Sequence, residues 1–226
     1  MSDAENPKYS VIGAGFPLTK RGSAMRFLLL SFSLIAAVLH AAPPAAAPSI
    51  IENGNFDNAT EPLKGWISDY EWSGNTHYLA NKKFVSIITE GARKNVVKMD
   101  SPGDQGVKIE CRAFPFEPGF RYICTLDVKG GGYRVYFNGY RWAPGVRPHE
   151  NPELGELREA YKSKAAVGTA ADWKQEKIEL PGVKPSPQAI ESLKQLRYLT
   201  VYIWFVKPGF VDNVTVTKVA DPTMKF

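Results

Sequence analysis

The sequence predicts an all-β protein, an antiparallel β-sandwich with one short helix and one long inserted loop. Aromatic residues make up 12% of the 226 residues, and 19 Gly and 17 Pro supply many turn formers. Both features favour a turn-rich β protein over a helical one. Several segments also alternate between apolar and polar residues, which is the pattern of strands with one buried face. A chain of this length can bury a full hydrophobic core in one domain.

The first 42 residues are expected to lie outside that domain. The apolar run FLLLSFSLIAAVL follows Met25 and Arg26, and the small residues Ala41 and Ala42 come shortly after it. A basic flank, a short apolar run and a small-residue cleavage site are typical of a secretory signal peptide. The run is shorter than the roughly 20 residues that a transmembrane helix needs. We therefore expect a signal peptide, with translation starting at Met1 or Met25, although a retained N-terminal anchor is the alternative.

The expected domain organisation follows from this boundary. Residues 1–42 form an N-terminal extension plus signal peptide, 43–48 a Pro/Ala linker, 49–220 the β-sandwich and 221–226 a tail. The expected location is secreted, periplasmic or otherwise extracellular, without membrane attachment once the signal peptide is removed.

The net charge of +5 is spread along the chain with no dense Lys/Arg run, so nucleic acid is not an expected partner. The oligomeric state stays open.

The expected elements follow from alternation and turn formers. Ser186 can cap a short helix whose first position is Pro187, over Pro185–Leu196. Asn151 can likewise cap a helical turn in the loop 144–164, and a strand is expected to return over Leu157–Ala166. Ile50 and Ile51 are expected to begin a first strand. The other expected strands are Thr76–Leu79, Phe84–Thr89, Asn95–Met99, Val107–Ala113, Arg121–Lys129, Tyr133–Trp142, Trp173–Leu180, Arg197–Val206 and Phe210–Lys218.

The segment Tyr133–Trp142 organises the functional prediction. Turn formers bracket it, because Gly130–Gly132 precede it and Ala143-Pro144-Gly145 follow it. One face of this strand carries Tyr133, Val135 and Phe137, as a core requires. The opposite face interleaves aromatic rings with hydrogen-bonding groups, which suits sugars, whose C–H faces stack on rings while their hydroxyls need polar partners. The alternative is an exposed strand face covered by large amphipathic residues.

Two further strands show the same division. Arg197–Val206 has an aliphatic row and a polar aromatic row, and Arg121–Lys129 has a core row opposite a polar row that includes Asp127. If the three strands are neighbours in one sheet, its outer face is an aromatic and polar platform. The candidate ligand-binding residues are Arg134, Tyr136, Asn138, Tyr140, Trp142, Tyr202, Trp204 and Asp127.

The chain contains two cysteines, Cys111 and Cys124. Val107–Ala113 and Arg121–Lys129 flank a Pro/Gly-containing loop and are expected to form a long-looped hairpin. An antiparallel register that places Cys111 opposite Cys124 also places Ile109 opposite Leu126. An exported chain permits a disulfide between them. Two buried, unreacted thiols are the alternative, because facing positions do not always meet disulfide geometry.

Three motifs resemble a known family in their order and spacing. They are the NGNFD…GW opening at Asn53–Trp66, PFEPGFRYICTLDVKG at Pro115–Gly130 and GFVDNVTVTKV at Gly209–Val219. Together they are similar to family 4/9 carbohydrate-binding modules, which belong to the galactose-binding-like jelly rolls. The resemblance spans roughly Ile50 to Val219. It implies a jelly-roll fold and, since this fold also serves protein and lipid recognition, it supports fold more strongly than function.

The resemblance also implies a structural Ca²⁺ where the first and last strands meet. Calcium takes six to eight oxygen ligands. On the matching positions the candidate ligands are Asp212, with Glu52 and Asp57, and Asn213 stands where the family often has a second acidic residue. That departure lowers the charge offered to the ion. Alternatively, Asp212 satisfies turn amides near the start of its strand.

The expected function is therefore non-catalytic carbohydrate binding by an exported module, through aromatic stacking and polar contacts. A protein- or lipid-interaction domain on the same fold is the alternative, because an exposed aromatic patch does not name its partner. A glycosidase is the third hypothesis: Glu150, Glu153, Glu156 and Glu159 could supply the two carboxylates such an enzyme needs. Regularly spaced Glu in a charged loop is more typical of a solvated surface, so we expect no catalysis.

Overall fold

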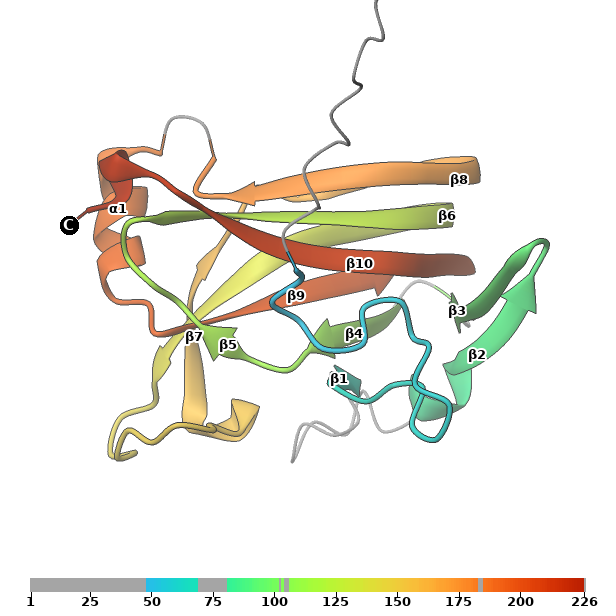
Figure 1. Cartoon of the computed structure of the whole chain (residues 1–226), viewed down its shortest axis with the longest axis horizontal. Helices are drawn as coiled ribbons and strands as arrows, with labels where there is room; N and C mark the ends of the chain where they lie inside the picture. The colour runs from blue at the N-terminus through green and yellow to red at the C-terminus, as the bar shows by residue number, and fades with distance from the viewer. Residues whose placement is uncertain (1–47, 69–80, 102, 104–105, 183–184, 226) are drawn as a thin grey trace, which may run out of the picture. The chain divides into compact units, whose positions relative to one another are not determined.

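Antiparallel strands dominate the computed structural model, as the sequence predicts (Figure 1). The structure describes residues 48–68, 81–101, 103, 106–182 and 185–225, all within the compact unit Ala45–Phe226. The expected signal peptide, the linker up to residue 47 and the expected strand Thr76–Leu79 lie outside the described residues. Within the described residues, no helix is long and apolar enough to cross a membrane.

The strands are β1 (Trp66–Ser68), β2 (Val85–Glu90), β3 (Arg93–Met99), β4 (Val107–Cys111), β5 (Phe114–Pro115), β6 (Phe120–Trp142), β7 (Leu157–Lys162), β8 (Ala166–Leu180), β9 (Tyr198–Phe205) and β10 (Gly209–Ala220). The helix is α1 (Pro187–Lys194), and three 3-10 turns are η2 (Asn81–Phe84), η3 (Leu154–Glu156) and η4 (Pro222–Met224).

The 23-residue strand β6 joins the two layers of the sandwich. Its first half pairs with β10 and β8, and its second half pairs with β9, β7 and the start of β8. The strand order is β1-β4-β9-β6-β10-β3-β2. Figure 1 shows β6, β8 and β10 running alongside one another. Since β6 changes neighbours midway, β4 and β9 lie in one layer and β10 and β3 in the other.

The glycine run inside β6 does not break the strand, contrary to the prediction. The pairing between β6 and β8 is irregular from Val128 to Tyr133, which is the signature of a β-bulge. Gly130 has φ +116°, and a Cβ there would lie 2.4 Å from the Gly209 Cα, so only glycine fits this crossing. The bulge shifts the alternation, so Val128 and Tyr133 both face the core.

The core consists of the apolar rows that the alternation predicts. Val135 and Phe137 of β6 and Ile203 of β9 are fully buried, and they belong to one continuous cluster that includes both layers. The aliphatic row of β9 therefore faces inward along its whole length. Its polar aromatic row then lies on the outer face, which is the face of interest for function.

The predicted hairpin between Cys111 and Cys124 does not form. β4 pairs with β1 and β9, and Ile109 faces Ile203 rather than Leu126. The connection after β4 forms β5 against β9, so the chain crosses to the other layer instead of turning back on itself. Both cysteines are buried free thiols, and Cys111 Sγ accepts a hydrogen bond of 3.0 Å from the Val201 amide. The structure therefore contains the buried thiols rather than the predicted disulfide.

Three other local predictions can be compared directly. The helix is confirmed: the Ser186 hydroxyl accepts a hydrogen bond from the Ala189 amide at 3.2 Å, and Pro187 occupies the first helical position. The helical turn in the long loop is the 3-10 turn η3, which begins after Glu153 rather than at Asn151. Ile50 and Ile51 form no strand, although the Ile50 amide donates to the Val216 carbonyl at 2.7 Å.

Candidate functional site

The pairing of β6 with β9 brings most of the predicted ligand-binding residues onto one face. Arg134 lies opposite Trp204, and Tyr136 lies opposite Tyr202. The next strand, β4, adds Lys108 beside Trp204 and Glu110 beside Tyr202. The functional prediction depended on the two aromatic strands being neighbours in one sheet. Their pairing confirms this adjacency. We call this outer surface of β4, β9 and the second half of β6 the β6–β9 face.

The two tyrosines at the centre of this face stack on each other. The rings of Tyr136 and Tyr202 lie 4.8 Å apart at an angle of 20°. Lys108 Nζ lies 5.4 Å from the centre of the Tyr202 ring, and Lys162 Nζ lies 5.7 Å from the centre of the Tyr136 ring. Burial, followed by the nearby Glu110 and Glu159 carboxylates, raises the pKa of Tyr136 to about 12. The flat sides of both rings therefore face neighbouring side chains, and Tyr202 is 8% exposed whereas Tyr136 is half-buried.

Trp204 is the half-buried indole of this face. The Arg134 guanidinium carbon lies 5.0 Å from the centre of its ring, within cation–π range. The indole also packs against Gly106, where a Cβ would come within 1.8 Å of Trp204 Nε1. That nitrogen is buried and has no hydrogen-bond partner in the described part of the chain. Because Gly106 has no side chain, there is room for the Trp204 indole beside it.

Asn138 and Tyr140 are buried rather than presented to solvent, with exposed fractions of 3% and 2%. Tyr140 packs against Leu154 and Leu157 in a small apolar cluster. The segment after β6 therefore folds back over the end of the β6–β9 face. These two residues cannot serve as open stacking or hydrogen-bonding surfaces in this conformation.

Their polar groups instead surround Glu110, a residue that the sequence analysis did not select. Glu110 Oε1 accepts hydrogen bonds from the Tyr140 hydroxyl at 2.7 Å and from Asn138 Nδ2 at 3.3 Å, and from the Thr200 hydroxyl. The residue is 1% exposed, and burial raises the pKa of its carboxyl group, against the lowering effect of the three donors. Glu110 Oε2 and Asn138 Oδ1 have no partner among the described residues. The sequence VKIEC of β4 could have pointed to Glu110, because its alternation puts Lys108 and Glu110 on the polar side of the strand.

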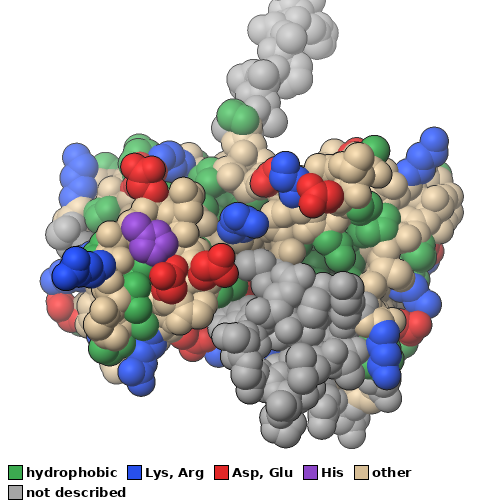
Figure 2. Space-filling model, turned by 90° about the horizontal axis from the view of Figure 1, so that it is seen from below, with side chains coloured by type: hydrophobic (Ala, Val, Ile, Leu, Met, Phe, Trp, Pro, Cys, Tyr) green, Lys and Arg blue, Asp and Glu red, His purple; other side chains and the backbone are tan. Residues whose placement is uncertain are grey.

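A second aromatic group lies at the end of β6. The Trp142 ring meets the Tyr198 ring edge-on at 5.5 Å and lies 5.1 Å from the His149 ring. His149 Nε2 contacts Glu156 Oε2 at 3.0 Å. In Figure 2 this histidine, the only one in the described chain, is the purple side chain beside red acidic ones. Trp142 is thus separated from Trp204 by the buried Asn138–Tyr140 section.

A groove of about 290 Å³ adjoins this group. It lies between the connection from β4 to β5 and the part of the long loop that precedes η3. Its lining residues are Arg112, Ala113, Phe114, Pro115, Glu150, Asn151, Pro152, Glu153 and Leu154.

Asp127 lies in a different cluster from the other predicted ligand-binding residues. It sits on the first half of β6, opposite Asp212 of β10. Arg93 Nη1 bridges the two carboxylates, at 2.7 Å from Asp127 and 3.2 Å from Asp212, and its guanidinium lies 4.2 Å from the centre of the Trp173 ring. The hydrogen bond to Asp127 raises the pKa of Arg93. Asp127 therefore holds the β2–β3 hairpin to the sheet.

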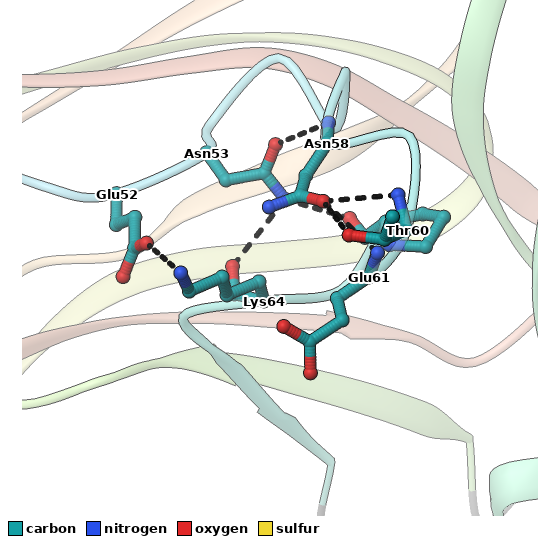
Figure 3. A network of polar contacts seen from close by, with 7 residues as sticks. Glu52, Asn53, Asn58, Thr60, Glu61 and Lys64 are labelled. Carbon is teal, nitrogen blue, oxygen red and sulfur yellow. Dashed lines mark hydrogen bonds and ion pairs between the residues drawn. The ribbon is translucent and has the colours of Figure 1, made fainter.

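The three predicted calcium ligands are engaged separately. Asp212 contacts Arg93, and Asp57 accepts hydrogen bonds of 2.7 Å from both Asn55 and Asn95. Glu52 pairs with Lys64 at 3.3 Å (Figure 3). No group of three His, Cys, Asp or Glu residues suited to a metal occurs among the described residues. In the described structure the positive charge beside Asp212 is that of Arg93. Calcium binding stays a prediction.

Two of the four glutamates considered for hydrolysis are held in contacts of their own. Glu156 accepts hydrogen bonds from the Glu153 amide at 2.8 Å and from His149, and the amide contact in particular lowers its pKa. Glu159 pairs with Lys162 at 3.2 Å. A retaining or inverting glycosidase needs one carboxyl group that stays protonated opposite one that is ionised. These contacts favour the ionised form of Glu156, whose carboxylate caps the 3-10 turn η3.

No protein-family model and no curated protein matches the sequence. Among solved structures, the TmCBM61 module in complex with β-1,4-galactotriose is 13% identical, with a TM-score of 0.42, over 76% of this chain and 100% of that chain. A Clostridium thermocellum endo-1,4-β-D-xylanase, solved as its CBM22-1 and GH10 modules with xylohexaose, is 11% identical, with a TM-score of 0.45, over 70% of this chain and 27% of that chain.

A third match is the tandem CBM22 domain of a Paenibacillus barcinonensis protein. It is 11% identical, with a TM-score of 0.45, over 77% of this chain and 51% of that chain. The chain thus spans about half of the tandem and about a quarter of the xylanase structure.

Proposed function

We propose that this chain is a non-catalytic, exported carbohydrate-binding module and that the β6–β9 face is its binding surface. The observation that carries the proposal is the direct pairing of Arg134 with Trp204 and of Tyr136 with Tyr202 on the outer side of one sheet. These side chains combine ring surface with hydrogen-bonding heads, and sugars require both.

The geometry changes the expected mode of recognition. The Tyr136 and Tyr202 rings stack on each other and Tyr202 is 8% exposed, so this pair offers no flat stacking platform. Trp204, half-buried and with the Arg134 guanidinium over its ring, is the indole best placed to meet a pyranose face. Lys108 and Arg134 supply donors for ring and hydroxyl oxygens. Recognition then depends on one main ring contact and several polar contacts, and no group needs to change its protonation state.

A glycan array of the full chain tests this proposal, with a parallel measurement of released reducing ends. We expect saturable binding to at least one polysaccharide class and no release of reducing ends. Repeating the array with EDTA separates a calcium requirement from the sugar contacts. Binding of a protein or lipid partner by a folded chain that leaves the array blank would contradict the proposal and support the interaction-domain alternative.

Trp204→Ala on the same array locates the site. Trp173→Ala is the matched control, since Trp173 is also a half-buried strand tryptophan but contacts Arg93 and Glu90 in the other cluster. Loss of glycan binding only in Trp204→Ala, with both variants folded by circular dichroism, is the expected result. Equal binding by the two variants would remove Trp204 from the site.

A further inference from the structure

The β6–β9 face gathers positive charge from three different strands. Arg134 of β6, Lys108 of β4 and Lys162 of β7 each lie over one of its aromatic rings, at 5.0, 5.4 and 5.7 Å from the ring centres. Cations on three separate strands meet here only because β4 and β9, which are distant in sequence, pair side by side. A ligand that complements these cations would carry negative charge.

Of these three cations, Arg134 is the one best placed to donate hydrogen bonds to a ligand. Its side chain is exposed, and within the described chain it forms no ion pair, its contact being the face of Trp204. A guanidinium has five N–H donors in a planar fork that matches a carboxylate in bidentate geometry. The contact with the indole places the guanidinium over Trp204. A carboxylate arriving over Trp204 would therefore meet these donors.

The acidic groups of the face are engaged away from Arg134. Glu159 pairs with Lys162 at 3.2 Å and offsets the charge of that lysine. Glu110 is 1% exposed and lies in a network with two buried acceptors that lack a partner among the described residues, its own Oε2 and Asn138 Oδ1. Asn138 Nδ2 already donates to Glu110 Oε1 at 3.3 Å.

A single proton on Glu110 Oε2 would turn that oxygen into a donor. The carboxylic acid could then donate to the Asn138 amide oxygen while Asn138 Nδ2 donates to Glu110 Oε1. Buried polar groups in folded proteins are nearly always paired, and burial acts on the Glu110 carboxyl in the same direction by raising its pKa. Glu110 is then a neutral structural group, and the accessible charge of the face is positive.

We propose that the ligand of the β6–β9 face is an acidic glycan, with a uronic acid carboxylate held by Arg134 over Trp204. This inference rests on the proposed function, because it names the class of carbohydrate for the same site. Neutral contacts then come from the half-buried Tyr136, and the carboxylate adds the selectivity between acidic and neutral chains.

The test compares each of several acidic polysaccharides, polygalacturonate among them, with its carboxyl-reduced counterpart, which keeps the chain and removes the charge. We expect the full chain to bind an acidic form at least about tenfold more tightly than its reduced form, since charge-assisted bidentate contacts are strong. Raising NaCl from about 50 to about 500 mM should weaken that binding several-fold, because salt screens exposed charges.

Arg134→Gln should bring the ratio between acidic and reduced forms close to one while keeping residual binding. Arg141→Gln is the matched control, because Arg141 is exposed on the same strand but points to Gln195 near α1, at 3.5 Å. It should keep the full ratio. Equal binding of acidic and reduced forms, or an unchanged ratio in Arg134→Gln, would overturn the acidic-glycan inference and leave the proposed function standing. Failure to bind any acidic or neutral glycan would overturn both.

Discussion

Arg134 of β6 lies directly opposite Trp204 of β9, with its guanidinium carbon 5.0 Å from the centre of the indole ring. This contact joins two segments that are 70 positions apart in the sequence numbering, and it marks the accessible end of the β6–β9 face. Further along β6 the same face is covered, so that Asn138 and Tyr140 are nearly inaccessible. The section around Arg134, Tyr136 and Trp204 is therefore the accessible part of this face.

Glu110→Gln should make the stability of the protein less dependent on pH. An unfolded glutamate ionises near about pH 4.3, whereas burial raises the pKa of Glu110 in the folded chain. Between those two values the folded state holds one proton more, so its contribution to stability is full below about pH 4.3 and is lost as pH rises through the folded pKa. A neutral glutamine keeps the hydrogen-bond pairing and does not ionise.

Thermal unfolding of both proteins between about pH 5 and about pH 7 measures the difference. The upper limit stays below the range in which Lys108 titrates, because burial lowers the pKa of its amine to about 8. The wild type should lose stability relative to Glu110→Gln as pH rises, by about 1.4 kcal/mol for each pH unit over which Glu110 alone stays protonated in the folded state. Parallel curves for the two proteins would show that Glu110 is ionised when folded.

Gly106→Ala should destabilise the fold and displace Trp204. The new Cβ would lie 1.8 Å from Trp204 Nε1 and 2.7 Å from the Phe205 carbonyl oxygen, at φ +70°. We expect a loss of about 3 kcal/mol, from overpacking together with the left-handed backbone. Gly145→Ala is the control, since Gly145 has φ +85° but no atom within 4 Å of a new Cβ. It should lose only about 1 kcal/mol. Urea unfolding compares the two, and equal losses would show that the indole does not fill this space.

Cys111 and Cys124 should behave as two inaccessible thiols. Both are buried and free, and burial raises the pKa of each thiol. The thiolate is the reactive form, so a chromogenic disulfide reagent should react slowly with the native protein and with two thiols per chain in guanidinium without reductant. Absence of thiols in the unfolded, unreduced protein would show that the disulfide forms.

Arg93→Gln should weaken the fold without changing glycan binding. It removes the bridge between Asp127 and Asp212, whose side chains are 14% and 8% exposed. Because Arg93 is itself about a third exposed, we expect a loss of about 2 kcal/mol rather than the full cost of a buried pair. Lys98→Gln is the control, because its pair with Asp100 is largely exposed and should contribute less than about 0.5 kcal/mol.

Chemical denaturation of both variants, with and without EDTA, measures these losses. The same comparison tests calcium, since a bound ion at Asp212 would make the wild type sensitive to the chelator. Equal stabilities for Arg93→Gln and Lys98→Gln would contradict the structural role given to Arg93.

The sequence was sufficient to predict the strand faces but not the contacts between distant strands. Alternation identified the inward row of β9 and the outward Tyr202 and Trp204, because each strand reports its own buried face. It also identified the cap of α1 at Ser186. The position of Glu110 depends on β4 pairing with β9, which lies about 90 residues further along the chain. No local sequence pattern predicts the pairing of β4 with β9.

The two largest errors have physical causes as well. Three consecutive glycines were interpreted as a turn, whereas close contact with Gly209 makes them a bulge inside β6. Asn138 and Tyr140 have the parity of an exposed face, yet Leu154 and Leu157 cover Tyr140. A strand pattern gives the side of the sheet, and only the tertiary fold decides whether that side reaches solvent.

The most direct test of the β6–β9 face is a nuclear magnetic resonance titration of the ¹⁵N-labelled full chain with the glycan that binds best on the array. The account predicts shifts concentrated on β4, β9 and the second half of β6, including the Trp204 indole, with the Trp173 indole unchanged. Shifts concentrated at the groove of Arg112 and Glu150, or around Arg93 and Trp173, would contradict it.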